Sequence, residues 1–260
     1  MILHFERSGV GETVVILHGL MGSCENWRGV RAALSADHDV ICLDLPNHGR
    51  SPHVGCFSVR SIVDDIKETL DRLSVSTFTL VGHSLGGKVA MQMASERAER
   101  LRGLVVVDIS PRAIQPVHLF VLRACQQLEL AEATRRGELD AALAAFVPQR
   151  ETRDFLLKNI VRNAEGRFAW RVPLQALIDN YRIVSDAPPL RAPYEGPALF
   201  VAGGRSPFGM AADETLIQSW FPAARFVTIA EAGHLVHADQ PEMFLAHLRA
   251  FFETIPQASA

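Results

Sequence analysis

The stretch "FTLVGHSLGGKVAMQMA", Phe78 to Ala94, predicts a buried strand, a sharp turn and a helix in immediate succession. Ser84 lies between the strand and the helix, with Gly82 two residues before it and Gly86 two residues after it. A serine in such a turn adopts a strained backbone, which only small residues at those two positions accommodate. The pattern favours Ser84 as a nucleophile over a helix cap, because a cap does not need glycine on both sides.

The same alternation of strand and helix extends outward from this turn in both directions. Apolar runs of strand length cover 13–19, 39–45, 78–82, 104–108, 198–204 and 225–230, and helical patterns cover 27–36, 59–73, 85–100, 213–221 and 241–252. Most of the runs lack polar alternation, as strands buried on both faces do. The sequence therefore predicts the α/β class, with a mostly parallel sheet of about seven strands and helices on both faces.

The alternation stops between Pro111 and Pro193, where the apolar spacing is helical throughout. The proline-rich segment 186–197 then returns the chain to the sheet, since each proline blocks continuation of a helix. We therefore expect a core formed by residues 1–110 and 194–260, and an all-helical cap, with no strand of its own, formed by residues 111–193.

The composition of the 260 residues limits the classes of partner. A formal charge of -3 leaves no basic footprint for nucleic acid or an anionic membrane, so we expect a small-molecule partner. The start lacks the features of a signal peptide, and no stretch is long and apolar enough to span a bilayer, so we expect a cytoplasmic protein. Four scattered cysteines are expected to be reduced thiols: Cys24, Cys42, Cys56 and Cys125.

The stretch "VVILHGLMGS" places a glycine-bearing loop directly after a buried strand. A tetrahedral oxyanion needs two preset N–H donors, commonly one from such a loop and one from the residue after the nucleophile. The backbone N–H groups of Leu20 and Leu85 occupy those two places. The alternative is an ordinary turn in which His18 is a structural hydrogen-bonding side chain.

A histidine loop lies near the C-terminus, in "RFVTIAEAGHLVHADQPEMF". His234 follows the last strand and precedes the last helix, which suits the general base for Ser84; His237 is the competing candidate. The two histidines form an H-x-x-H pair, but no third ligand stands at suitable spacing, so no metal is expected. Asp239 is interpreted as the cap of the final helix.

These motifs, with "DLPNHGRS", "VVVDISP" and "GGRSPF", are the residues through which the chain resembles the α/β-hydrolase family, and within it the small YbfF-type esterases. The resemblance covers essentially the whole chain. It implies an α/β-hydrolase fold, a cap at 111–193 and the order serine, acid, histidine along the chain. The start is short, with only residues 2–6 as a strand-like stretch before the first apolar run at 13–19, so we expect the first strand of the full eight-stranded sheet to be missing.

The position of the acid departs from the pattern of the wider family, whose members often carry it after the strand that here is 198–204. The matching position falls at or next to Ser206, and residues 203–212 contain no Asp or Glu. Asp213 lies where a helix should start and is better interpreted as its cap. Asp108, at the end of the neighbouring strand, is our candidate acid, and we expect the Ser206 hydroxyl to contact Asp108 or His234.

Asp44 and His48 are a second acid and histidine pair that could be considered for a catalytic role. Their motif is shared across the family, so we expect them to shape a turn beside the site rather than to act on the substrate. The resemblance then implies a serine hydrolase of short to medium acyl esters or thioesters, with no cofactor. Alternatives are a carbon–carbon bond hydrolase or lyase with the same triad, and a non-catalytic receptor.

Substrate selection is expected in the cap and beside the nucleophile, where apolar side chains would set acyl length. The candidates for the pocket are His83, Phe120, Leu122, Phe146, Phe155, Trp170 and Leu174. Arginines in the cap could bind a phosphate of coenzyme A, but we favour the alternative that they lie on solvent-exposed faces of helices. These residues are Arg135, Arg136, Arg150, Arg153 and Arg162. The sequence leaves the oligomeric state open.

Overall fold

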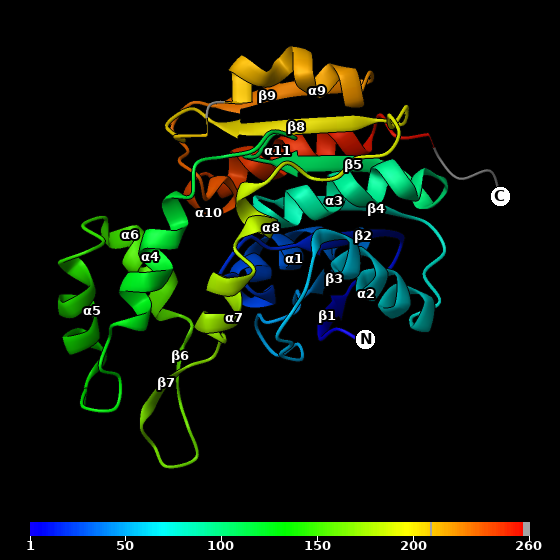
Figure 1. Ribbon diagram of the computed structural model, residues 1–260. Helices are drawn as coiled ribbons and strands as arrows, with labels where there is room; N and C mark the ends of the chain where they lie inside the picture. Colours follow the sequence, from blue (N-terminus) through cyan, green and yellow to red (C-terminus); the bar gives the residue numbers. More distant parts are fainter. Residues whose placement is uncertain (209, 257–260) are drawn as a thin grey trace.

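A seven-stranded sheet forms the centre of the computed structural model, which describes residues 1–208 and 210–256 (Figure 1). Its strands follow the order β1-β3-β2-β4-β5-β8-β9, and only β1 runs antiparallel to its neighbour. The strands are β1 (Phe5–Ser8), β2 (Glu12–Leu17), β3 (His38–Leu43), β4 (Phe78–His83), β5 (Leu101–Val107), β8 (Ala198–Gly203) and β9 (Ala224–Ile229). The predicted mostly parallel sheet is confirmed. The apolar runs missed β1, because three of the four residues of this edge strand, "FERS", are polar.

Consecutive residues of the interior strands explain why these runs are apolar throughout. Val106 packs into one apolar cluster, while Val105 and Val107 pack into another, on the opposite face of the sheet. All three side chains are fully buried. A strand covered on both faces has no solvent-facing position for a polar residue.

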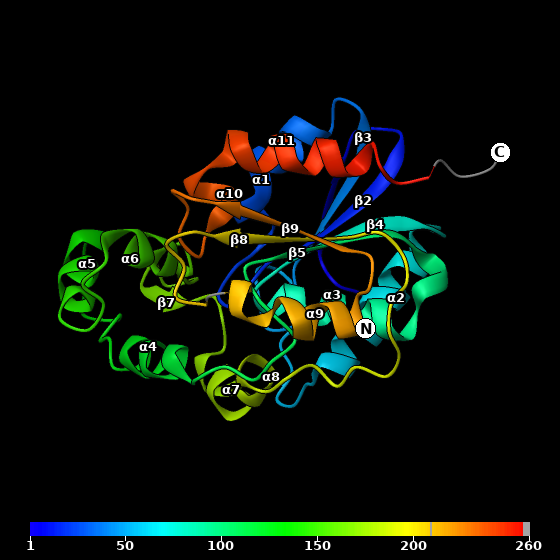
Figure 2. The same ribbon diagram turned by 90° about the horizontal axis from the view of Figure 1, so that it is seen from above.

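Helices cover both faces of the sheet, as the view from above shows (Figure 2). The helices α1 (Arg28–Leu34), α10 (Val236–Asp239) and α11 (Pro241–Phe252) lie on one face, and α2 (Val59–Arg72), α3 (Leu85–Glu96) and α9 (Glu214–Trp220) lie on the other. None of the helices within the described residues has the length and apolar character needed to cross a bilayer.

Residues 111–193 form five helices and a hairpin beside one end of the sheet (Figures 1 and 2). These elements are α4 (Val117–Gln126), α5 (Arg136–Ala144), α6 (Arg150–Leu157), β6 (Ile160–Arg162), β7 (Phe168–Trp170), α7 (Leu174–Asp179) and α8 (Arg182–Ser185). The prediction of an all-helical insertion is therefore wrong at β6 and β7, which pair antiparallel. The reason lies in the turn: Gly166 adopts a φ of 74°, and Asn163 pairs with Arg167, so the chain folds back instead of continuing α6.

We propose that residues 111–193 act as a cap on the core of residues 1–110 and 194–260, of which 257–260 lie outside the described residues. A buried lysine on α3 ties the two together. Lys88 donates from Nζ to the carbonyl oxygens of Val184 and Asp186, both at 2.6 Å. Burial lowers the pKa of this amine to about 8, and the two carbonyls satisfy two of its three donors.

The turn between β4 and α3 is held by close backbone contacts that only glycine permits. A Cβ on Gly82 would lie 2.3 Å from the carbonyl oxygen of Gly86. A Cβ on Gly86 would in turn lie 2.5 Å from the carbonyl oxygen of Leu17, at the end of β2. These contacts bring the start of α3 against the end of the neighbouring strand.

Replacing Gly82 by alanine should therefore destabilise the fold by about 1–3 kcal/mol, because the added methyl group meets rigid backbone. The free energy of unfolding, obtained by chemical denaturation, measures this effect. Gly29→Ala is the matched control: a Cβ there meets nothing within 4 Å, and alanine favours the helix by roughly 0.5–1 kcal/mol. Equal stabilities of Gly82→Ala and the wild type would contradict the steric explanation.

Candidate active site

Three of the predicted site residues follow the carboxyl ends of parallel strands. Ser84 follows β4, Asp108 follows β5, and His234 lies in the loop after β9. The carboxyl ends of parallel strands meet at one edge of the sheet, which brings the three residues into one region. Ser84 has φ 52° and ψ −115°, and Asp108 has φ 54°, so both sit in strained backbone conformations of the kind that cluster at functional sites.

Asp108 and His234 form a close pair, in which the carboxylate is buried and the imidazole is partly exposed. The Asp108 carboxylate is 1% exposed, and its Oδ2 lies 2.6 Å from Nδ1 of His234. Because a carboxylate only accepts hydrogen bonds, this contact places the imidazole proton on Nδ1 and leaves the Nε2 lone pair free. The backbone N–H of Gly203 donates to the other carboxylate oxygen, Oδ1, at 2.9 Å.

The hydroxyl of Ser206 donates to Oδ2 of Asp108, so the serine in the place vacated by the family's acid contacts the carboxylate that we assign to that role. The same hydroxyl oxygen accepts the backbone N–H of Phe208 at 3.3 Å. Ser206 thus links the loop after β8 to the end of β5.

The alternative acid, Asp213, is engaged elsewhere. Its Oδ2 accepts hydrogen bonds from Ser110 Oγ at 2.7 Å and from Arg112 Nε at 2.5 Å. Arg112 also donates to the carbonyl oxygen of Phe208 at 3.0 Å. Asp213 therefore fastens the segment that follows Asp108 instead of orienting His234.

The loop after β2 lies against Ser84, and hydrogen bonds to the Gly19 carbonyl oxygen fix the orientation of its backbone. The carbonyl oxygen of Gly19 accepts from His18 Nδ1 at 2.8 Å and from the Gly22 N–H at 3.0 Å. In a trans peptide the C=O and the next N–H point in opposite directions, so the Leu20 N–H points away from these donors. A Cβ on Gly19 would lie 3.2 Å from Ser84 Cβ, which shows how closely the loop approaches the serine.

His83 and His237 surround His234 without taking its place. The Nε2 of His83 donates to the carbonyl oxygen of His234 at 2.7 Å and so holds its backbone. The ring of His237 stacks on Trp27 with centroids 3.9 Å apart, and burial lowers its pKa to about 3. The competitor His237 is thus a neutral packing residue.

The Asp239 carboxylate serves the His234 loop. It accepts from the N–H of Gly233 at 2.8 Å, and the residue that caps α11 is Gln240. The expected capping role of Asp239 is therefore wrong, because α10 occupies 236–239 and the final helix begins one residue later than such a cap requires.

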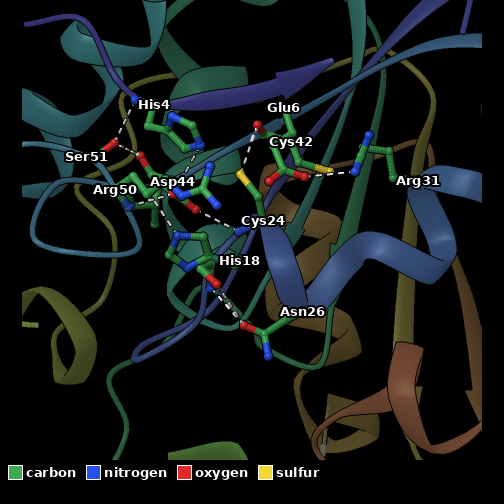
Figure 3. Close-up of polar contacts among 12 residues, drawn as sticks. His4, Glu6, His18, Cys24, Asn26, Arg31, Cys42, Asp44, Arg50 and Ser51 are labelled. Carbon is green, nitrogen blue, oxygen red and sulfur yellow. Dashed lines mark hydrogen bonds and ion pairs between the residues drawn. The ribbon is translucent and has the colours of Figure 1, made fainter. Parts of the chain in front are cut away.

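Asp44 belongs to a separate buried network, which Figure 3 shows between β1, β3 and the loop after β2. Its carboxylate accepts the N–H groups of Cys24 at 2.7 Å and Arg50 at 2.8 Å. Burial opposes ionisation, but the neighbouring His18 and these N–H donors outweigh it, so the pKa of Asp44 is lowered. The side chain of His48 contacts the carbonyl oxygen of Pro46, and burial lowers its pKa to about 3. Both residues shape the turn.

A cavity of about 540 Å³ opens over Ser84 and His234, between the core and the cap. Of the predicted pocket residues, His83, Leu122 and Phe155 line it. The lining residues that the structure describes do not include Phe120, Phe146, Trp170 or Leu174, which lie elsewhere in the cap. Phe120 and Phe146 are exposed, at 61% and 40%, Leu174 is buried in the apolar cluster, and the Trp170 indole donates to the Cys125 carbonyl oxygen.

The described residues that line this cavity include none of the five cap arginines. Arg135 pairs with Glu138, Arg150 pairs with Asp154, and Arg153 pairs with Asp140. The other two donate to backbone carbonyl groups of the hairpin, Arg136 to Ile160 and Arg162 to Gly166. No cluster of three or more potential metal ligands occurs in residues 1–208 and 210–256.

Sequence reasoning missed two cap residues beside the site. Asn159, which is buried, donates from Nδ2 to the carbonyl oxygen of Met21 at 2.6 Å and so contacts the loop that carries Leu20. His118 lines the cavity and lies 6.1 Å from His234 between ring centroids. Neither residue stands in a motif, so only the fold reveals their position.

Comparison with known proteins agrees with this geometry. A family model described as the alpha/beta hydrolase fold matches residues 12–241. The chain is 35% identical over 258 residues to the sn-1-specific diacylglycerol lipase ABHD11 of Xenopus tropicalis, covering 96% of this chain and 81% of the relative. It is 31% identical over 239 residues to esterase YbfF of Escherichia coli (strain K12), covering 92% of each.

A solved structure titled marine microorganism esterase superposes with a TM-score of 0.92 at 33% sequence identity, covering 96% of this chain and 99% of that one. The matched family model spans most of the chain, and the relatives exceed 30% identity over nearly all of it. The chain therefore belongs to the α/β-hydrolase family, as a hydrolase close to the YbfF-type esterases.

Proposed function

We propose that the protein hydrolyses carboxylic esters of short to medium acyl chain through an acyl-enzyme at Ser84, with His234 as the base and Asp108 as the acid. The observation that carries the proposal is the contact between His234 Nδ1 and the buried Asp108 carboxylate, which leaves Nε2 available to a nucleophile. The names of the relatives, lipase and esterase, both denote ester hydrolysis and support the reaction class.

In the first step, the hydroxyl oxygen of Ser84 attacks the ester carbonyl carbon while His234 Nε2 takes the serine proton. The carbonyl oxygen becomes an oxyanion, for which the Leu20 and Leu85 N–H groups are the donors. Leu85 begins α3, so the free N–H groups and dipole of that helix also favour the negative charge. Asp108 stabilises the imidazolium that forms.

The tetrahedral intermediate then collapses. The imidazolium of His234 gives its proton to the leaving alcohol oxygen, the C–O bond breaks, and the acyl group stays on Ser84. In the second half, His234 takes a proton from water, the resulting hydroxide equivalent attacks the acyl carbon, and the proton returns to Ser84 as the acid leaves. No step requires a cofactor.

The cavity supports an apolar acyl group. Its apolar lining includes Val121, Leu122, Phe155 and Leu156, and a volume of about 540 Å³ is within the range of small-molecule sites. The cap arginines are engaged with other cap groups outside it, which disfavours a role for them in binding coenzyme A phosphates. We therefore place esters before acyl-coenzyme A thioesters as substrates.

The proposal is tested first by labelling with a fluorophosphonate and by a panel of p-nitrophenyl esters from acetate to decanoate. We expect one label per chain, at Ser84, and turnover that declines at long acyl chains. Ser84→Ala should lose both labelling and turnover, while Ser76→Ala, at an exposed serine before β4, leaves Ser84 labelled. A chain that binds no label and cleaves only carbon–carbon diketone substrates, or nothing, contradicts ester hydrolysis.

The identity of the acid is tested by Asp108→Asn. We expect kcat to fall by about a thousandfold or more, since an amide cannot stabilise the imidazolium and favours the wrong tautomer. Asp213→Asn is the matched variant and should keep kcat within a few-fold, because Asp213 bonds Ser110 and Arg112. Near-normal turnover in Asp108→Asn, with a loss in Asp213→Asn, would reverse the assignment.

Ser206→Ala removes one donor from the Asp108 carboxylate without touching His234. We expect kcat to fall roughly tenfold with little change in KM, because the group acts on the orientation of the acid. Steady-state kinetics on one ester measures both constants, and Ser206→Thr, which keeps the hydroxyl, should recover part of kcat. Full activity in Ser206→Ala would mean that Gly203 and His234 alone position the carboxylate.

A further inference from the structure

His118 brings an unused imidazole from the cap to the catalytic cavity. It is the second residue of α4, and its backbone N–H donates to the Tyr181 hydroxyl at 3.1 Å, which fixes the start of the helix. Its ring stacks on Phe208 with centroids 5.7 Å apart at 18°. Phe208 in turn packs against His234 at 4.5 Å between ring centroids. His118 is therefore held in place beside the catalytic histidine.

The hydrogen-bonding state of the His118 ring follows from its burial. Its Nδ1 is buried and has no hydrogen-bond partner among the described residues. A buried N–H without an acceptor is rarer than a buried acceptor without a donor, so the neutral ring carries its proton on Nε2. Burial and the neighbouring His234 lower the pKa of His118 to about 4, which keeps the ring uncharged at neutral pH.

The location of His118 places it beside the alcohol portion of a bound ester. His234 must protonate the leaving alcohol oxygen, so the alcohol portion of an ester lies next to His234. His118 lines the same cavity as Ser84 and His234, and its ring lies 6.1 Å from that of His234. Nε2 is the ring nitrogen left to meet a ligand there.

We propose that His118 is a specificity-determining residue whose Nε2–H donates a hydrogen bond to an acceptor oxygen in the alcohol portion of an uncharged ester. The proposal rests on the ester hydrolysis proposed above and names the substrate class more closely. The class is esters of alcohols that carry a second oxygen close to the ester, such as glycol or glycerol esters, in preference to alkyl esters.

The choice of an uncharged alcohol follows from the charges at the cavity. Arg205 lines the cavity but is paired with Glu231, and His118 itself is neutral. The cap contributes mostly apolar side chains from α4 and α6. Arg205 is the one lysine or arginine among the described lining residues, so an anionic leaving group would lose its hydration there and would compete with Glu231 for that cation.

The test compares two butyrate esters of equal length, 2-methoxyethyl butyrate and n-butyl butyrate, of which only the first has an acceptor oxygen in the alcohol. The measured quantity is the kcat/KM of the first ester divided by that of the second. The intrinsic reactivities of the two esters are the same for every variant, so a difference in this ratio between variants reports the protein's contribution. We expect His118→Phe, which keeps the stacking on Phe208, to lower the ratio about threefold to tenfold, the effect of one neutral hydrogen bond. His118→Gln, which retains an N–H donor, should recover part of the preference.

His53→Phe is the matched control, because His53 is an exposed histidine in the loop after β3, and its ratio should equal that of the wild type. An unchanged ratio in His118→Phe, with both esters still hydrolysed, overturns the inference and leaves the proposed function standing. Absence of hydrolysis of both esters by the labelled wild type counts against the proposed function instead. If thermal denaturation shows that His118→Phe does not fold, His118→Leu replaces it, and equal ratios for His118→Leu and His118→Gln overturn the inference.

Discussion

The buried carboxylate of Asp108 is the constraint on which the rest of the site depends. A carboxylate that is almost fully removed from water must have its lone pairs occupied by donors, or the fold bears the cost of desolvation. Here three donors come from two segments: the Gly203 N–H and the Ser206 hydroxyl at and after the end of β8, and His234 after β9. Hydrogen bonds to this one carboxylate therefore link the segments at the ends of β5, β8 and β9.

The position of this acid on β5 is compatible with the sheet geometry. Val107 of β5 pairs with Val201 of β8, so the ends of the two strands lie side by side. Asp108, directly after β5, contacts His234, and Ser206, at the position where the resemblance places the wider family's acid, contributes a donor to the same carboxylate. A Cβ on Gly203 would lie 2.1 Å from the Gly233 carbonyl oxygen, so there is no room for a side chain between the acid and the histidine loop.

Much of this arrangement could be predicted from the sequence, because it depends on local patterns. Glycine spacing around Ser84, unbroken apolar strands and the late Gly233-His234 pair each specify a local conformation with a physical reason. The cap could not be predicted to the same depth. Its helices follow from apolar periodicity, but Ile160 and Phe168 fall in a hairpin closed by the turn at Gly166, which interrupts that periodicity. Apolar Phe120 and Phe146 are exposed instead of lining the cavity. Helical periodicity shows that a face is apolar, but it does not show what that face meets.

The hydrogen bond from Asn159 to Met21 gives the cap a part in assembling the site. The loop that bears the Leu20 N–H is fastened on one side by His18 within the core and on the other by this cap amide. A cap that swings away as a rigid body must break a buried hydrogen bond to the oxyanion loop, and must also release Lys88 from two carbonyls. In the mechanism that we propose, moving the cap away would therefore loosen the loop that carries the Leu20 N–H, and the enclosed form would be the one that holds this donor in place.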